Sequence, residues 1–208
     1  MTYPTHARRW ALVLAAVVLL AGCGPRDFGQ PASGGPPPTS KAETAEGFAR
    51  AILQLVSARR IADLAARVDP AQGLLFSPYG YVDRTSAVVL GPDALRQAWE
   101  ADTRLLWGHA DGTGEPIRLS IRQYFADYLD VADFAKAPEV ATNRQLGQGN
   151  SPNNLGDVFP NADYVEFHYP GFEPRYLGMD WVSLRIVMRR AADGQWRLLA
   201  LVNDRWTI

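Results

Sequence analysis

Apolar and polar residues alternate along much of the C-terminal part of this chain, and this pattern strongly restricts what the chain can fold into. Residues 164–169 and 181–190 both alternate. Successive side chains of a strand point to opposite faces of its sheet, so the pattern predicts two strands. Asp193-Gly194 is a typical hairpin turn and leads to a third strand at 195–202. An antiparallel sheet is therefore predicted here.

The same alternation assigns residues to the two faces of this sheet. The apolar set, expected to face the core, is Val165, Phe167, Tyr169, Val182, Leu184, Ile186, Met188, Leu199 and Leu201. The polar set is Glu166, His168, Ser183, Arg185 and Arg189. An antiparallel sheet commonly packs one face on the core and leaves the other face in water. Glu166 and His168 are therefore expected to form a half-exposed pair.

Helices are predicted before these strands. Ser40-Lys41-Ala42-Glu43 has the pattern of a capping box and opens an amphipathic helix over 41–58. Further helices are expected at 61–68, at 92–106 and, from a second capping box, at 120–129. Helices first and an antiparallel sheet last predict an α+β domain with the helices packed on one face of the sheet.

The connecting segments complete the predicted order. Short strands at 74–77 and 86–90 flank the turn Pro78-Tyr79-Gly80-Tyr81, and residues 141–161, rich in Asn and Gly, are expected to form a long irregular loop. This order resembles the NTF2-like, cone-shaped α+β fold over residues 40–208. The resemblance implies N-terminal helices packed on a curved antiparallel sheet that ends in long strands.

The N-terminal segment indicates where the protein is located. Arg8 and Arg9 precede an apolar run from Trp10 to Leu20 that is too short to span a bilayer and is typical of a signal peptide. Leu20-Ala21-Gly22-Cys23 then resembles the lipobox of bacterial lipoproteins. The resemblance implies cleavage after residue 22 and lipidation, including palmitate, of Cys23. An ordinary signal or membrane anchor with an incidental cysteine is the alternative.

Three segments follow from this interpretation: a signal peptide at 1–22, the lipidated cysteine with a disordered Pro/Gly tether at 23–40, and one α+β domain at 41–208. Gly24, in place of an aspartate after Cys23, implies by the same resemblance the outer membrane, with the domain facing the periplasm. Cys23 is the only cysteine, so its lipidation would leave no thiol for a disulfide.

Charge narrows the class of partner. The formal net charge is −1, and removal of Arg8 and Arg9 would make it more negative. A nucleic-acid partner is therefore not expected, because phosphate binding needs a clustered positive field. The expected partners are the membrane, through the lipidated N-terminus, and an unidentified envelope protein, glycan or small ligand.

Four residues are candidates for chemistry. His109 and His168 are the histidines outside the signal peptide, and His168 could act with Glu166, with Asp180 or His109 as a third group. Two ligands on one strand face leave a metal under-coordinated, so neither a metal nor another cofactor is expected. Residues 107–115 are glycine-rich but match neither an EF-hand nor a phosphate-binding loop, so a surface turn and a binding loop both stay open.

Aromatic residues could line a pocket for a sugar or an apolar ligand, or simply fill the core. Those near the predicted sheet are Tyr79, Tyr81, Trp107, Tyr164, Tyr169, Tyr176, Trp181, Trp196 and Trp206. No nucleophile motif is visible. Segments 75–79, 107–112, 178–181 and 204–208 are similar to parts of uncharacterised secreted bacterial proteins, which implies a family without a mechanism.

Two functions are consistent with these observations. The first is a lipid-anchored envelope protein whose domain binds a ligand or partner and has no catalytic signature. The alternative is a periplasmic NTF2-like enzyme, a hydrolase or isomerase, that uses a His/carboxylate pocket. The two differ in whether His168 or His109 lies in a concave pocket within hydrogen-bond reach of a carboxylate.

Overall fold

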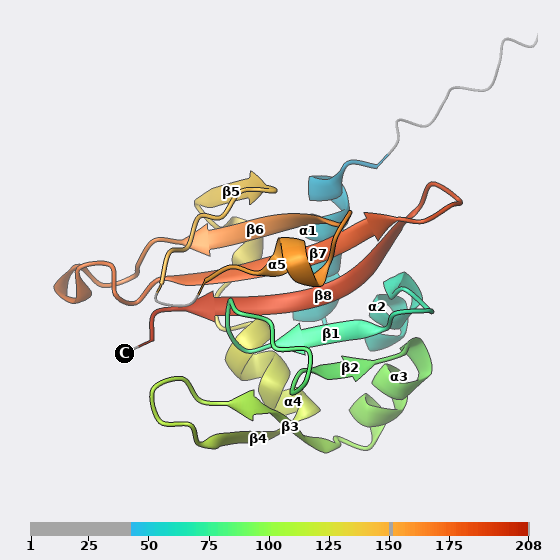
Figure 1. Ribbon diagram of the computed structural model, residues 1–208, viewed down its shortest axis with the longest axis horizontal. Helices are drawn as coiled ribbons and strands as arrows, with labels where there is room; N and C mark the ends of the chain where they lie inside the picture. The colour runs from blue at the N-terminus through green and yellow to red at the C-terminus, as the bar shows by residue number, and fades with distance from the viewer. Residues whose placement is uncertain (1–42, 150–151, 208) are drawn as a thin grey trace, which may run out of the picture. The chain divides into compact units, whose positions relative to one another are not determined.

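The main sheet of the computed structural model has six strands in the order β2-β1-β8-β7-β6-β5 (Figure 1). The strands are β1 (Leu74–Ser77), β2 (Val88–Leu90), β5 (Glu139–Thr142), β6 (Asp163–Tyr169), β7 (Val182–Arg190) and β8 (Trp196–Arg205). Neighbouring strands run antiparallel, except that β1 lies parallel to β8. The structure describes residues 43–149 and 152–207.

Predictions for the signal peptide, Cys23 and the tether fall on residues 1–42, outside the described residues. The described residues, 43–149 and 152–207, belong to one compact unit. In the described part of the chain, no helix combines the length and the hydropathy needed to cross a bilayer.

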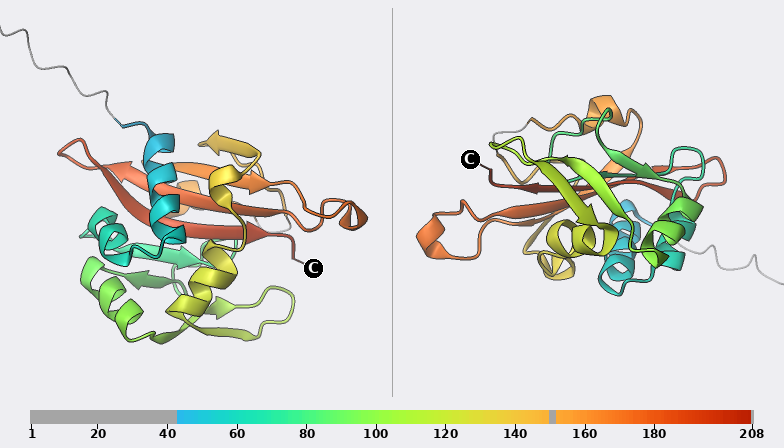
Figure 2. Two further views of the ribbon diagram at one scale, coloured as in Figure 1. Left: turned by 180° about the vertical axis from the view of Figure 1, so that it is seen from behind. Right: turned by 90° about the horizontal axis from the view of Figure 1, so that it is seen from below.

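Helices cover one face of the sheet, as predicted (Figure 2, left). They are α1 (Ala45–Ser57), α2 (Ile61–Arg67), α3 (Pro92–Glu100), α4 (Ile121–Tyr124) and the π-helical turn η1 (Phe125–Leu129). Apolar side chains of these helices share one core with the predicted apolar face of β6 and β7. Burial of this area is the main favourable term in folding. The predicted α+β class, with N-terminal helices packed on the sheet, is confirmed.

Two helix starts test the predicted capping boxes. Helix α1 begins four residues later than predicted, because Thr44 caps it and accepts a hydrogen bond from the backbone N–H of Gly47 at 3.0 Å. Glu43 precedes this helix and Ser40 lies outside the described residues, so the first box is wrong. The second box is confirmed: the Ser120 and Gln123 side chains each bond the other's backbone N–H.

The predicted helix at 92–106 ends early, at Glu100. Asp102 takes a left-handed conformation with φ of 47°, and Thr103 N–H bonds back to the Ala98 carbonyl at 2.8 Å. This is a Schellman-type helix end. The sequence did not indicate it, because the left-handed position is occupied by Asp rather than by the usual Gly. Residues after it form β3 (Arg104–His109), which pairs with β4 (Pro116–Ser120) in a separate two-stranded sheet.

The second face of the main sheet is also covered, contrary to the expectation of a solvated face. Residues 141–161, expected to be irregular throughout, include the end of β5 and the short helix α5 (Leu155–Val158), which lies over this face (Figure 1). Leu155 and Phe159 pack there against Val187 and Val202. This second layer explains why polar residues of the sheet are buried.

One residue of the predicted core face is misplaced. Leu199 packs in the second core rather than with Leu201, because it is an extra residue in β8. The register moves from Val187 opposite Ala200 to Met188 opposite Leu198, so Leu199 forms a bulge. A bulge inverts the parity of every earlier residue on its strand relative to every later one.

Candidate functional site

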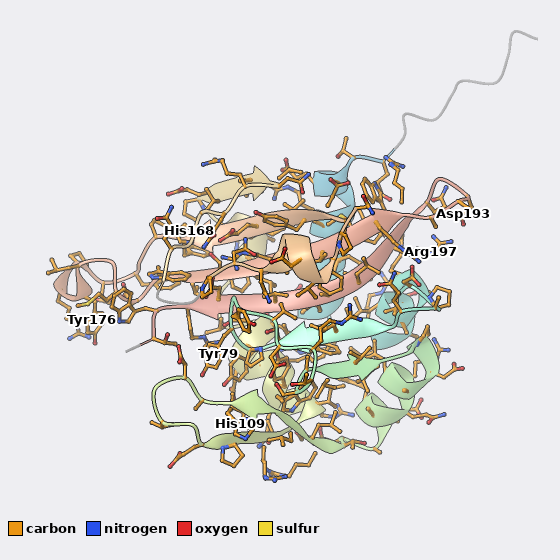
Figure 3. The ribbon with its side chains drawn as sticks, in the orientation of Figure 1. Tyr79, His109, His168, Tyr176, Asp193 and Arg197 are labelled. Carbon is orange, nitrogen blue, oxygen red and sulfur yellow. The ribbon has the colours of Figure 1, made fainter. Side chains whose placement is uncertain are left out.

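A cavity of about 340 Å³ opens between the β1–β2 loop and the end of β3. Its lining combines aromatic rings with polar groups: Tyr79, Tyr81, Asp83, Trp107, His109 and Asp111. Gly108 adopts a φ of 127° and permits the irregularity in β3 between Leu106 and His109. The cavity thus lies between a turn-rich loop and a bulged strand end, and Figure 3 shows Tyr79 and His109 on these two segments.

Stacked aromatic side chains support the floor of this cavity. The Trp107 ring stacks on Tyr124 with 3.9 Å between ring centroids, and Tyr124 stacks on Tyr128 at 4.8 Å. Trp107 Nε1 donates to the Leu119 carbonyl at 2.9 Å, so its one polar group is satisfied. The buried Trp107 therefore fixes the floor, while Tyr81, which is 50% exposed, is available to a ligand.

Two carboxylates and one imidazole supply the polar part of the lining. Asp83 accepts hydrogen bonds from Thr85 and Ser86, and these bonds lower the pKa of its carboxyl. The backbone N–H of Asp111 donates to the Tyr79 hydroxyl at 3.3 Å, which links the two sides of the cavity. His109 is exposed.

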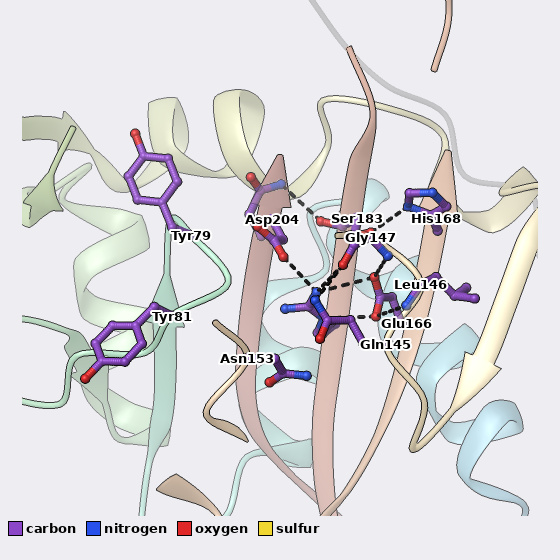
Figure 4. A network of polar contacts seen from close by, with 12 residues as sticks. Tyr79, Tyr81, Gln145, Leu146, Gly147, Asn153, Glu166, His168, Ser183 and Asp204 are labelled. Atoms are coloured by element: carbon purple, nitrogen blue, oxygen red, sulfur yellow. Dashed lines mark hydrogen bonds and ion pairs between the residues drawn. The ribbon is translucent and has the colours of Figure 1, made fainter. Parts of the chain in front are cut away.

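Behind the β1–β2 loop lies a buried network of charges centred on Arg185 (Figure 4). The guanidinium Nε donates to Glu166 at 3.0 Å and Nη2 donates to Asp204 at 2.7 Å. Arg185 and Glu166 are fully buried and Asp204 nearly so. The register explains the contact, since Glu166 lies opposite Arg185 and Asp204 lies opposite Ser183, two residues away on the same face.

The two carboxyls of this network respond differently to burial. Burial alone would raise the pKa of Glu166, but the charge of Arg185 and the accepted hydrogen bonds outweigh it and lower that pKa. For Asp204, burial outweighs the attraction of Arg185 and raises the pKa. Burial also lowers the pKa of His168, whose Nδ1 lies 2.8 Å from Ser183 Oγ. A neutral imidazole at neutral pH follows from that lowered pKa.

The backbone of the 143–149 segment covers the network and donates hydrogen bonds to it. The N–H groups of Leu146 and Gly147 donate to the two Glu166 oxygens at 3.0 and 2.8 Å. A Cβ at position 147 would lie 2.5 Å from the Trp181 ring and 2.7 Å from Ser183 Oγ. Only glycine allows this close approach, so the Gln-Leu-Gly sequence is what lets the segment cover Glu166.

The same network positions the loop that lines the cavity. A Cβ on Gly80 would lie 2.4 Å from Asp204 Oδ2, so the loop backbone rests directly on this carboxylate. Asn154 holds the far end of the loop, with Oδ1 accepting from Val82 N–H at 2.8 Å and Nδ2 donating to its carbonyl at 2.9 Å. In Figure 4, the Tyr79 and Tyr81 rings point away from the network. One side of the loop is therefore anchored and the other lines the cavity.

The four residues proposed for chemistry lie in three places. Glu166 and His168 are buried beneath the 143–149 segment, so the predicted half-exposed pair is wrong. Asp180 lies in the β6–β7 connection, where Oδ2 accepts the N–H groups of Phe172 and Glu173. His109 is the one that lines the cavity. Among the described residues, no group of three or more His, Cys, Asp or Glu side chains is arranged to hold a metal ion.

Sequence reasoning missed Arg185, Asp204 and Asp83. Arg185 was placed on the solvent face, and the signal for its burial lay in the register, which sets it beside Glu166. Asp83 carried a local signal, because Asp-Arg-Thr-Ser is a typical side-chain-capped turn. The glycine-rich 107–115 segment combines a strand end with a surface turn, and three of the expected aromatic residues, Tyr79, Tyr81 and Trp107, line the cavity.

Comparisons with known proteins identify no family. No protein-family model matches the chain, and neither does any curated protein. Among solved structures, Aln2 from a Streptomyces species is similar with a TM-score of 0.33 and 12% identity, over 82% of this chain and 93% of that one. An NTF2-like protein with a cystatin-like fold from Novosphingobium aromaticivorans has a TM-score of 0.32 and 12% identity, over 78% and 79%. At these TM-scores neither similarity says what the chain does.

Removing the charge of Glu166 tests the network. In Glu166→Gln, the amide NH₂ would face the donors that now surround the carboxylate and leave the Arg185 charge under-compensated. We expect a loss of about 3–5 kcal/mol in the free energy of unfolding, measured by urea denaturation at pH 7. The control is Glu46→Gln, in an ion pair whose Glu46 side chain is 48% exposed, with an expected loss below about 1 kcal/mol. Equal losses in both variants would contradict the assigned role.

Adding a methyl group at Gly80 tests the anchoring of the loop. In Gly80→Ala the new Cβ would collide with the Asp204 carboxylate, so either the loop or the network must shift. We expect a loss of about 1–3 kcal/mol in the free energy of unfolding, together with shifted NMR resonances of Tyr79 and Tyr81. Gly156→Ala in α5 is the control, because its Cβ meets open space. A Gly80→Ala variant as stable as the control would refute the close contact.

Proposed function

We propose that this chain is a lipid-anchored cell-envelope protein whose α+β domain binds a small ligand or a partner in the cavity between residues 77–87 and 107–111. The observation that carries the proposal is the aromatic lining on a rigid support. Tyr81 is half exposed, and the loop that carries it is fixed at Gly80 and at Val82. A preformed cavity that combines aromatic rings with a few placed polar groups is a usual geometry of a ligand site.

The anchor part of the proposal rests on the sequence. The lipobox-like tetrapeptide ending at Cys23 supports cleavage and lipidation, and Gly24 supports transfer to the outer membrane, with the domain facing the periplasm. One acyl chain gives marginal membrane binding, and additional chains, at about 0.8 kcal/mol per buried CH₂, give stable anchoring. The residues between Cys23 and the domain would then tether the domain to the membrane.

The alternative is a periplasmic hydrolase or isomerase. Such an enzyme would have to use His109 with Asp83 or Asp111, since these groups line the cavity and Glu166, His168 and Asp180 do not. General acid–base catalysis needs a positioned proton-transfer pair. Within the described residues, the structure records no hydrogen bond between the His109 ring and a carboxylate. Binding is therefore the function that the geometry supports best.

Replacing Cys23 tests the anchor. Cys23→Ser removes the thiol that would accept the first lipid, so we expect the protein in the soluble fraction or as an unprocessed precursor in the membrane. Fractionation with mass spectrometry of the N-terminus distinguishes these products. A Cys23→Ser protein that is cleaved after Gly22 and still sediments with the membrane would show that lipidation is not the anchor.

Replacing Tyr81 tests the cavity. The probes are benzamidine, benzamide, benzoate and phenyl glucoside, which share a ring and differ in charge, and binding to residues 41–208 is followed by NMR titration. We expect at least one probe to bind, and Tyr81→Ala to weaken it by about tenfold or more. Tyr176→Ala is the control, because Tyr176 is 44% exposed in the β6–β7 connection, away from Tyr79 in Figure 3.

Two results would contradict a ligand site at this cavity. One is that none of the four probes binds. The other is that each bound probe binds Tyr81→Ala and Tyr176→Ala with equal affinity, because the binding surface would then lie elsewhere.

A further inference from the structure

The charges of the cavity have one sign. Asp83 and Asp111 line it, and the described residues of its lining include neither lysine nor arginine. Among the described residues, none of the ion pairs includes either aspartate. We infer that the cavity selects a cationic ligand, one that carries an ammonium, amidinium or guanidinium group on a small apolar or aromatic body. This inference rests on the proposed function and specifies its ligand.

Neutral donors hold the Asp83 carboxylate in place. Oδ1 accepts from Thr85 N–H at 2.9 Å and from the Thr85 hydroxyl at 2.7 Å, and Oδ2 accepts from the Ser86 hydroxyl at 2.9 Å. These bonds keep the group ionised, as its lowered pKa also indicates, but they add no positive charge. A carboxylate has about four lone-pair positions, so Asp83 keeps capacity for a donor from a ligand.

Asp111 is held in a similar way. Its Oδ1 accepts from Gly112 N–H at 3.0 Å and its Oδ2 accepts from the Thr207 hydroxyl. Both partners are neutral, so the negative charge is fixed in position and left uncompensated. Two fixed carboxylates at one cavity attract a cation and repel an anion.

The aromatic rings provide a second, independent observation. Elsewhere the chain places its own arginines over aromatic rings: Arg122 lies 4.7 Å from the Trp99 centroid, Arg190 4.3 Å from that of Trp196 and Arg205 4.6 Å from that of Tyr128. Within the described residues, no such contact involves Tyr79, Tyr81 or Trp107. The Tyr81 ring, which is 50% exposed, is therefore open to a cation–π contact with a ligand.

A cationic ligand could be a free small molecule or a basic side chain of a peptide, and the experiment includes both. The small-molecule pair is benzamidine and benzamide, which have nearly the same shape and differ by one charge. The peptide pair is acetyl-Gly-Arg-Gly-amide and its citrulline counterpart, which differ in the same way. Dissociation constants for residues 41–208 are measured by NMR titration at low and at high salt.

We expect the cationic member of at least one pair to bind about tenfold or more tightly than its neutral counterpart, and added salt to reduce this preference. The pair with the larger preference identifies the source as a small molecule or a peptide. The double variant Asp83→Asn/Asp111→Asn should abolish the preference, because Asn can keep the turn hydrogen bonds without the charge. Asp93→Asn in α3, where the side chain is 82% exposed, is the control and should retain it.

The outcomes separate this inference from the proposed function. Equal binding of charged and neutral members, lost in Tyr81→Ala, would overturn the charge selectivity and leave a neutral ligand in the same cavity. Preference for benzoate would overturn it as well. Absence of binding by every probe would instead overturn the ligand site itself. A preference that survives the double variant would mean that charges other than Asp83 and Asp111 select the ligand.

Discussion

The fold of this protein depends on how one buried guanidinium is compensated. Arg185 lies at the centre of the longest strand pair, with a carboxylate on each side: Glu166 on β6 and Asp204 on β8. A buried charge without partners would cost several kcal/mol, so the loss of either carboxylate would destabilise this face of the sheet. The backbone N–H groups of Leu146 and Gly147 complete the network by donating to Glu166, and they belong to the segment that leads into the second layer. Hydrogen bonds to Glu166 of the sheet thus position the irregular 143–149 segment.

The same network also positions the loop that lines the cavity. Gly80 rests on Asp204, and from there the loop turns its tyrosine rings outward. Asn154, just before α5, fixes the loop again at Val82, so the second layer and the cavity loop support each other. Catalytic or binding residues on loops work when a rigid scaffold places them. Here the scaffold is a charge network, so cavity geometry and the stability of the second layer are expected to change together.

The periodicity of the apolar residues and the residue types in the turns sufficed to predict the α+β class, the hairpin at Asp193-Gly194 and the core face of β7. They failed where the outcome depended on a single backbone conformation. Asp102 in the left-handed region ends α3 and frees residues for β3, and the bulge at Leu199 inverts the face of the residues before it. The alternating pattern of β6 could not predict the burial of Glu166, because the 143–149 segment that covers it has no apolar periodicity.

The candidate site shows a related limit of residue-type reasoning. The search for histidines led to His168, which is buried and whose pKa is lowered by that burial. The cavity is lined instead by tyrosines and aspartates in turns. What distinguishes the two aspartates is that, among the described residues, neither takes part in an ion pair; Arg84, the neighbour of Asp83, donates to the Val158 carbonyl instead. Three arginines lie over the rings of Trp99, Trp196 and Tyr128, whereas within the part that the structure describes none lies over Tyr79, Tyr81 or Trp107. Such an uneven distribution is a tertiary property, since it appears only when the distant residues 77–87 and 107–111 are brought face to face.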